Sequence, residues 1–224
     1  MKENVIKPIG IIHTDFKEKF GIPRQSGRIK TAFGKIELFE PFNNKSSLSG
    51  LENFSHIWLI FDFSLAHSDK LSTTARPPRL GGNKRVGIFA CRSPFRPNNL
   101  GLSSVKIERI NEDFTIDVSG VDILDNTPIY DIKPYIPYTD IHNDAVGSFA
   151  EENKNHRLKI TVGEEKLNII PGEKRRTAID CLCDDPRPAY QDDCNRIYHM
   201  SFASFDIHFK VNVTDIEIIA VDKI

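Results

Sequence analysis

Short apolar runs separated by turns dominate the first two thirds of the chain. Residues 5–14 and 34–39 have the apolar content and flanking turn residues of strands. Residues 57–63 (Ile-Trp-Leu-Ile-Phe-Asp-Phe) form a nearly continuous apolar run of strand length, which predicts a strand buried on both faces. Three more strands are predicted further along, at residues 85–91, 100–107 and 114–119.

Five or six short strands without a long intervening helix predict a mainly β fold, with a small closed or nearly closed β-barrel. Residues 140–156 are polar and acidic and are typical of a connector. We therefore expect a barrel domain over residues 1–142 and a small α+β domain over residues 143–224. The second domain is predicted to contain a strand at 157–162, a helix within 171–183 and a hairpin of residues 205–213 and 215–221.

The composition is that of a globular protein, with 224 residues of which 39% are hydrophobic and 27% charged. No apolar run approaches the roughly 20 residues that cross a bilayer, and Met1–Asn4 lack the apolar core of a signal peptide. We expect a cytoplasmic protein with no membrane association and reduced cysteines. Cys181 and Cys183, near Cys194 and His199, do not have the CxxC spacing of zinc sites, so no metal is expected.

The charge is unevenly distributed although the formal net charge is only −1. Residues 70–109 contain nine Lys and Arg residues and one acid, whereas residues 111–152 contain ten acids and one lysine. This distribution suits a polyanion that is bound in one place and repelled from another. Two solvated faces that neutralise each other are the alternative.

The densest group of conspicuous residues lies between 76 and 101. Its glycines, among them Gly81 and Gly82, allow the backbone to approach a ligand closely, and its prolines stiffen the turn between two predicted strands. Arg92 and Arg96 project from that turn and suit bidentate contacts with carboxylates or phosphates. Alternatively, these arginines pair with the acids of 111–152.

A second group spans residues 122–138. Asp122 or Asp125 can accept hydrogen bonds from a ribose diol or an α-ammonium group. The alternative is a turn followed by an edge strand. Acidic, basic and aromatic side chains are mixed in the second half of this segment, namely Asp131, Lys133, Tyr135 and Tyr138.

A third group spans residues 184–190, where two prolines hold Arg187 and Tyr190 at fixed orientations. The alternative is a capping turn after the predicted helix.

Several of these segments together resemble the TsaA/TrmO family. They are RPPRLGG (76–82), RVGIFACRSPFRPNNLGLSSV (85–105), DIKPYIPY (131–138) and DPRPAY (185–190). The resemblance implies an enzyme that uses S-adenosylmethionine to methylate the exocyclic nitrogen of threonylcarbamoyladenosine, next to the anticodon of threonine tRNA. It also implies a small β-barrel and a homodimer.

Roles of individual residues follow from this resemblance by position. Ser64 stands where the family usually has a histidine, so a side-chain role of that histidine does not transfer, and His67 follows three residues later. The implied cofactor-binding residues are Pro23, Arg24, Gln25, Phe63, Ser64, Arg92, Leu102, Asp122, Ile123, Leu124 and Asp125.

Methyl transfer from a sulfonium depends mainly on in-line positioning and desolvation, but the ureido acceptor nitrogen should benefit from proton removal. Our catalytic candidates are Asp131, Lys133 and Tyr135: Asp131 or Tyr135 accepts the proton, while Lys133 or Arg187 holds the threonyl carboxylate. Substrate-binding candidates are Arg96, Arg187 and Tyr190, with the basic stretch 70–109 on the phosphates of the anticodon stem-loop.

Two alternatives have no catalytic activity. One is an S-adenosylmethionine-binding sensor that has lost the acceptor site, and the other is a barrel that binds RNA and no cofactor.

Overall fold

The computed structural model describes residues 5–68, 70, 72–77, 84–152 and 154–224. The chain falls into two compact units that interleave along the sequence. The first contains Met1–Thr14, Arg24–Leu71 and Pro94–Ile141, and the second contains Asp15–Pro23, Ser72–Ser93 and His142–Ile224. A single boundary at residue 142 therefore describes the chain less completely than these units do.

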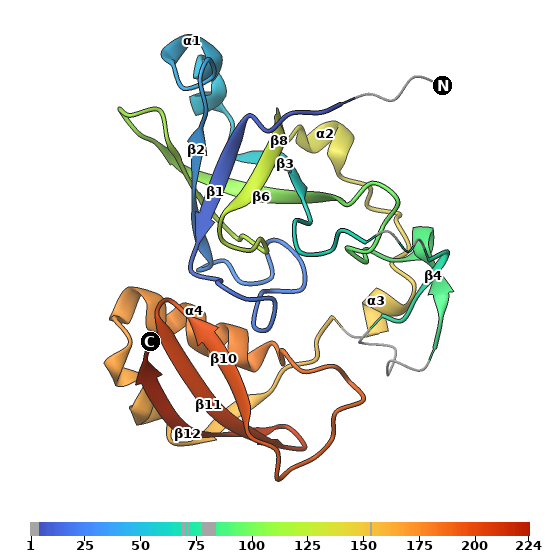
Figure 1. Ribbon diagram of the computed structural model, residues 1–224, viewed down its shortest axis with the longest axis vertical. Helices are drawn as coiled ribbons and strands as arrows, with labels where there is room; N and C mark the ends of the chain where they lie inside the picture. The colour runs from blue at the N-terminus through green and yellow to red at the C-terminus, as the bar shows by residue number, and fades with distance from the viewer. Residues whose placement is uncertain (1–4, 69, 71, 78–83, 153) are drawn as a thin grey trace. The chain divides into compact units, whose positions relative to one another are not determined.

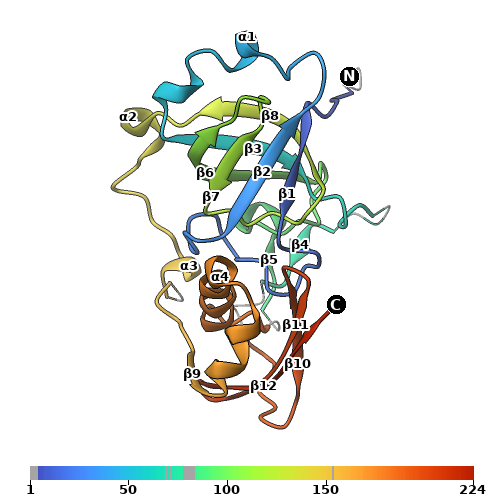
Figure 2. The ribbon, with the colours of Figure 1, turned by 90° about the vertical axis from the view of Figure 1, so that its left-hand side faces the viewer.

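A closed antiparallel barrel forms the first unit, as Figures 1 and 2 show. Its strands follow one another around the barrel in the order β1-β2-β7-β6-β3-β8, so that both edges of each strand are paired. The predicted barrel is confirmed. The strands are β1 (Gly10–Thr14), β2 (Phe33–Leu38), β3 (His56–Asp62), β6 (Leu100–Ile110), β7 (Ile116–Ser119) and β8 (Thr127–Pro134).

The barrel strands other than β7 bury one face only. On β3, Ile57, Leu59 and Phe61 are buried, whereas Trp58 and Ile60 are half-buried on the outer face. The expectation that this strand is buried on both faces is wrong. A strand in a parallel sheet is covered by helices on both faces, whereas the outer face of this barrel strand is only half-buried.

Gly101 of β6 faces Phe61 of β3 across the ladder. A Cβ atom at residue 101 would lie 2.3 Å from the Phe61 ring, so only glycine fits there.

The segment 85–91 is not a barrel strand, contrary to prediction. It contains β5 (Val86–Gly87), paired with β4 (Thr74–Ala75), and then the 3-10 turn η3 (Ile88–Ala90). Strand β8 completes the barrel instead. An edge strand in this segment is expected from the sequence only as an alternative, because the two prolines and mixed polar residues of β8 lack a clear alternation.

Short helical segments complete the barrel unit. They are α1 (Lys45–Leu48), η1 (Leu51–Asn53) and α2 (Pro137–Asp140). The side chain of Asn44 accepts hydrogen bonds from the amides of Ser46 and Ser47 and so caps α1.

A four-stranded sheet in the order β10-β11-β12-β9 forms the second unit. The predicted helix and final hairpin are confirmed, whereas β10 was not predicted. The strands are β9 (Lys159–Val162), β10 (Tyr198–Phe202), β11 (Phe205–Asn212) and β12 (Asp215–Lys223), and the helical segments are α3 (Phe149–Glu152), η4 (Glu164–Ile169) and α4 (Gly172–Cys183).

Residues 15–23 follow β1 in the sequence but pack within the second unit. The amide of Ala203 donates to the Asp15 carbonyl at 3.1 Å, and Lys174 Nζ lies 2.7 Å from Asp15 Oδ1. The rings of Phe16 and Phe202 pack with their centroids 5.5 Å apart. These contacts explain why the two units interleave.

No helix among the described residues is long and apolar enough to cross a membrane. All four cysteines are free thiols, as expected.

Candidate functional site

Two loops of the barrel unit are joined by backbone hydrogen bonds. The amide of Gly27 donates to the Gly120 carbonyl at 2.8 Å, and the amide of Val121 donates to the Ala32 carbonyl at 3.2 Å. Gly120 has a φ of +77°, and a Cβ atom there would lie 3.2 Å from Gly27 Cα. The joined loops bring the segment with Arg24 and Gln25 to the loop that contains residues 122–125.

The loop between β7 and β8 is anchored to barrel strands through its acidic side chains. Asp122 Oδ1 accepts a hydrogen bond from Ser103 Oγ at 2.6 Å, and Asp125 Oδ1 accepts one from the Thr14 amide at 2.8 Å. Asn126 donates to the other oxygen of Asp125 at 2.7 Å. The Asp125 side chain is only 8% exposed, so this carboxylate positions the loop on β1.

Main-chain carbonyls of the same loop are held as well. Thr14 Oγ1 donates to the Ile123 carbonyl at 3.1 Å, and Thr127 Oγ1 donates to the Leu124 carbonyl at 2.7 Å. The predicted cofactor-binding loop is therefore rigidly attached at both ends.

Strand β3 places a predicted cofactor residue and a predicted catalytic residue on the same outer face. Ile60 pairs with Leu102 of β6 on one side and with Asp131 of β8 on the other. Two strand spacings separate the backbones of Leu102 and Asp131 by roughly 10 Å. The Leu102 side chain is 58% exposed, so an apolar surface lies beside a carboxylate.

The catalytic candidates lie together along β8 and just beyond it. Lys133 Nζ is 2.9 Å from Asp131 Oδ2, and the Tyr135 ring packs on Trp58 with centroids 5.5 Å apart. Trp58 Nε1 donates to Asp140 Oδ2 at 3.0 Å, which fixes the ring on which Tyr135 rests. The arrangement offers a proton acceptor, a cation and an aromatic surface side by side.

Asn99 is a positioning residue that the sequence did not single out. Its carbonyl accepts from the Phe63 amide at 2.8 Å, and its side-chain nitrogen donates to the carbonyls of Ala66 and Pro94 at 3.0 and 2.9 Å. These bonds fix the segment with Phe63 and exposed Ser64 against the turn that carries half-buried Arg96. The available signal was its place inside the 85–105 motif.

The side chains of Asp62 and His67, close to Ser64 in the sequence, form a contact that the sequence did not predict. His67 Nε2 lies 2.8 and 2.9 Å from the two Asp62 oxygens. Burial, and then the charge of Asp62, raises the pKa of the Tyr130 hydroxyl.

Four predicted site residues belong to the second unit. Pro23 is buried, Arg92 is exposed, and Tyr190 is 59% exposed. Arg187 is buried in an ion pair: its Nε lies 2.9 Å from Asp185 Oδ1, and its guanidinium lies over the Tyr198 ring at 5.7 Å.

Internal partners account for the charge of Arg187. Burial alone would lower its pKa, but the hydrogen bond and charge of Asp185 outweigh burial and raise the pKa. Asp185 also lies 2.9 Å from His156 Nε2. The geometry gives Arg187 a role in holding the 184–190 turn, from which Tyr190 projects.

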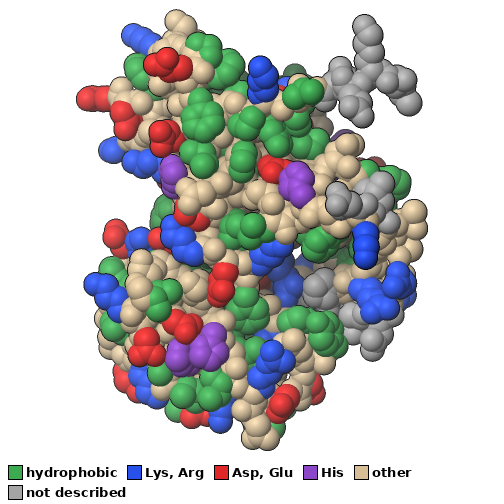
Figure 3. Space-filling model, in the orientation of Figure 1, with side chains coloured by type: hydrophobic (Ala, Val, Ile, Leu, Met, Phe, Trp, Pro, Cys, Tyr) green, Lys and Arg blue, Asp and Glu red, His purple; other side chains and the backbone are tan. Residues whose placement is uncertain are grey.

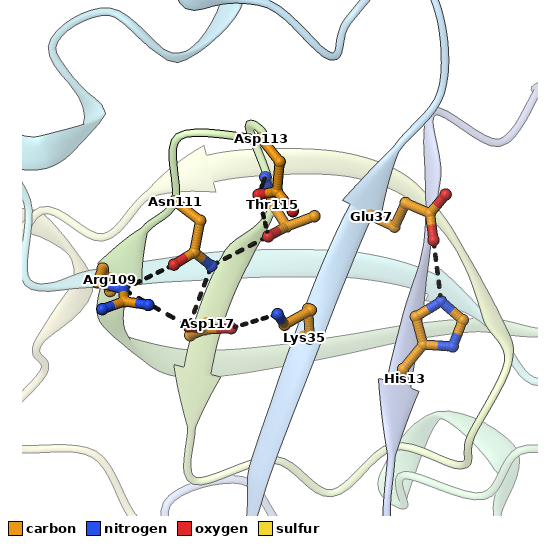
Figure 4. A network of polar contacts seen from close by, with 8 residues as sticks. All are labelled: His13, Lys35, Glu37, Arg109, Asn111, Asp113, Thr115 and Asp117. Atoms are coloured by element: carbon orange, nitrogen blue, oxygen red, sulfur yellow. Dashed lines mark hydrogen bonds and ion pairs between the residues drawn. The ribbon is translucent and has the colours of Figure 1, made fainter.

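Two cations at the end of the basic stretch 70–109 pair with acids: Arg109 with Asp117 of the acidic stretch, and Lys106 with Glu108 of its own stretch. Arg109 Nε lies 4.0 Å from Asp117, which also faces Lys35 at 3.7 Å on the outside of the barrel, in the network of Figure 4. Lys106 donates to Glu108, and hydrogen bonds from Ser119 and then Lys106 lower the pKa of Glu108.

The other part of the stretch lies in the second unit around β4 and β5. Blue side chains gather there in Figure 3. Arg79, Gly81 and Gly82 lie outside the described residues. The exposed cations described there are Arg76, Lys84, Arg85 and Arg92.

The donor set of the barrel unit fits S-adenosylmethionine. Asp122 offers a half-buried carboxylate for a diol or an ammonium group, and Gln25 offers an exposed amide. Leu102 and Phe63 offer apolar surface for an adenine ring or a sulfonium methyl group.

Buried Cys181 is poorly suited to ligate zinc. Burial, and then Asp184 and Asp180, raises the pKa of its thiol, which opposes formation of the thiolate that a metal requires.

Comparisons with known proteins match nearly the whole chain to one family. Residues 11–141 match the model of the tRNA-methyltransferase O N-terminal domain, and residues 162–224 match that of the TrmO C-terminal domain. A tRNA (adenine(37)-N6)-methyltransferase of Escherichia coli K12 is 35% identical over 96% of both chains. A Pseudomonas aeruginosa protein assigned as an S-adenosylmethionine-dependent methyltransferase is 40% identical over 91% of both.

A solved structure gives the same result for the fold. The crystal structure of TrmO from P. aeruginosa superposes with a TM-score of 0.81 at 30% sequence identity, and the match covers 100% of this chain and 98% of that one.

The anchoring of the 120–126 loop predicts different effects for two substitutions of Asp125. Asp125→Ala leaves the buried Thr14 amide without this acceptor and should lower the free energy of unfolding by about 1–3 kcal/mol. Asp125→Asn retains an acceptor oxygen and should cost less than half as much. Urea unfolding of both variants measures the difference, and equal losses would contradict the anchoring role.

Proposed function

Because this chain belongs to the tRNA-methyltransferase O family, we propose that it methylates N6 of threonylcarbamoyladenosine next to the anticodon of threonine tRNA. The methyl donor is S-adenosylmethionine. One observation supports the assignment of the site. Leu102 and Asp131 pair with the same residue, Ile60, from opposite sides, so a cofactor candidate and a catalytic candidate lie on one face of the barrel.

S-adenosylmethionine supplies an electrophilic methyl group on a positively charged sulfur. The joined loops hold Gln25 and Asp122 to bind its polar groups, and Leu102 and Phe63 cover its apolar parts. Because Ser103 and Thr14 fix the loop in advance, little conformational entropy is lost when the cofactor binds.

Asp131 is the residue we propose to accept a proton from the ureido nitrogen. Lys133 Nζ, 2.9 Å from Asp131 Oδ2, is placed to hold the threonyl carboxylate of the modified base. Tyr135, supported by Trp58, offers a surface on which a base can stack.

Exposed cations around β4 and β5, with Arg96, are proposed to bind phosphates of the anticodon stem-loop. Tyr190 is proposed to contact the RNA directly. Arg187 supports it from within the turn, since its guanidinium is already committed to Asp185. Because the substrate is tRNA, we place the enzyme in the cytoplasm.

Homodimer formation is also proposed. Besides the family resemblance, exposed apolar side chains on the barrel unit support it, namely Leu65, Phe95 and Leu100.

The substrate is tested by transfer of labelled methyl from S-adenosylmethionine to threonine tRNA. Incorporation is expected into tRNA that carries the threonylcarbamoyl group and not into tRNA that lacks it. S-adenosylhomocysteine should inhibit the reaction. Binding of S-adenosylhomocysteine without incorporation into either tRNA would favour the sensor, whereas tRNA binding without cofactor binding would favour the RNA-binding barrel.

The roles of Asp131 and Lys133 are separated by steady-state kinetics. Asp131→Asn should lower kcat by about 100-fold with little change in KM for tRNA, because the base is lost. Lys133→Met should mainly raise KM for the modified tRNA. Lys35→Met is the matched control, since Lys35 is a similarly exposed member of another ion pair on the barrel. Unchanged kcat in Asp131→Asn would remove Asp131 as the base.

The oligomeric state is measured by light scattering of the purified chain. A mass of twice 25.5 kDa is expected. A fully active species with the mass of one chain would exclude any contribution of a partner subunit to the site.

A further inference from the structure

A cluster of metal-ligating side chains lies on the four-stranded sheet of the second unit, and neither the cofactor site nor the RNA contacts use it. Its members are His199 of β10, Asp206 and His208 of β11 and Asp222 of β12. We propose that this cluster binds one divalent transition-metal ion of the Zn²⁺ type. This proposal departs from the expectation of no metal, which considered only the cysteines with His199.

Strand register explains why these residues meet. His199 pairs with His208 across β10 and β11, and Asp206 pairs with Asp222 across β11 and β12. Asp206 and His208 are two residues apart on one strand, so they project from the same face. That face is the half-exposed one, because Phe205, Ile207 and Phe209 are buried on the other.

Two histidine nitrogens converge on Asp206 at hydrogen-bonding distances, slightly shorter than the separation of ligand atoms around one ion, and a second carboxylate faces His208. Asp206 Oδ2 lies 3.0 Å from His199 Nδ1 and 2.9 Å from His208 Nε2, and His208 Nε2 lies 3.4 Å from Asp222 Oδ2. In a tetrahedral zinc site with bonds of 2.0–2.1 Å, neighbouring ligand atoms are separated by roughly 3.3 Å. The ligand atoms of His199, Asp206 and His208 all lie within 4.8 Å of one another.

The donor types select the class of ion. Two imidazoles with carboxylates suit Zn²⁺ and similar transition metals, whereas Mg²⁺ and Ca²⁺ prefer oxygen ligands throughout. The two carboxylates also balance the double positive charge. Adjoining purple and red side chains are visible at the surface in Figure 3.

A bound ion would cross-link β10, β11 and β12. It would therefore stabilise the second unit without taking part in methyl transfer.

The test uses the untagged full chain after treatment with a chelator. Titration with ZnCl₂ by calorimetry should show one site per chain, and CoCl₂ should give the intense visible absorption of tetrahedral Co²⁺. His199→Gln and His208→Gln should each weaken Zn²⁺ binding by at least about tenfold, because each removes a direct ligand. Zn²⁺ should raise the melting temperature of the wild type more than that of either variant.

His67→Gln is the matched control. His67 also lies beside a carboxylate, at 2.8 Å from Asp62, but among the described residues no third potential ligand joins this pair. Its substitution should leave Zn²⁺ binding unchanged. Absence of stoichiometric Zn²⁺ binding, or binding that survives both cluster substitutions, would overturn the proposal and leave His199, Asp206 and His208 as a hydrogen-bonded cluster only.

Discussion

Pairing of β3 on both edges is the constraint on which the candidate site depends. Its hydrogen bonds to β6 and β8 complete the barrel, and they also set the register that puts Leu102 and Asp131 opposite the same residue, Ile60. A shift of one residue in either ladder would turn one of these side chains into the barrel interior. The same two ladders therefore close the barrel and set the arrangement of the candidate site.

The barrel could be predicted because strand periodicity is a local property of the sequence. The strands predicted at residues 34–39 and 100–107 agree with β2 and β6 to within a few residues at each end. The hairpin of β11 and β12 was predicted from the alternation of apolar and polar residues. Strand β8 was less evident, since its place between β1 and β3 depends on pairing with strands distant in sequence.

Partners of charged side chains were the hardest feature to predict. Arg187 is a predicted substrate ligand, and the sequence shows no sign that its guanidinium faces Asp185, which adopts a left-handed φ of 55° two residues earlier. Asn99 showed no signal beyond its position in a motif, because its three anchoring bonds join segments that meet only in the folded chain. The cluster around Asp206 likewise depends on cross-strand register.

The packing of residues 15–23 in the second unit has a consequence for biosynthesis. Glu18 accepts a hydrogen bond from the amide of Ser201, across a sequence separation of 183 residues. Residues 15–23 thus wait until β10 has been synthesised before these native contacts exist. Such non-local contacts slow folding, and the second unit can be completed only once the strands up to β12 have left the ribosome.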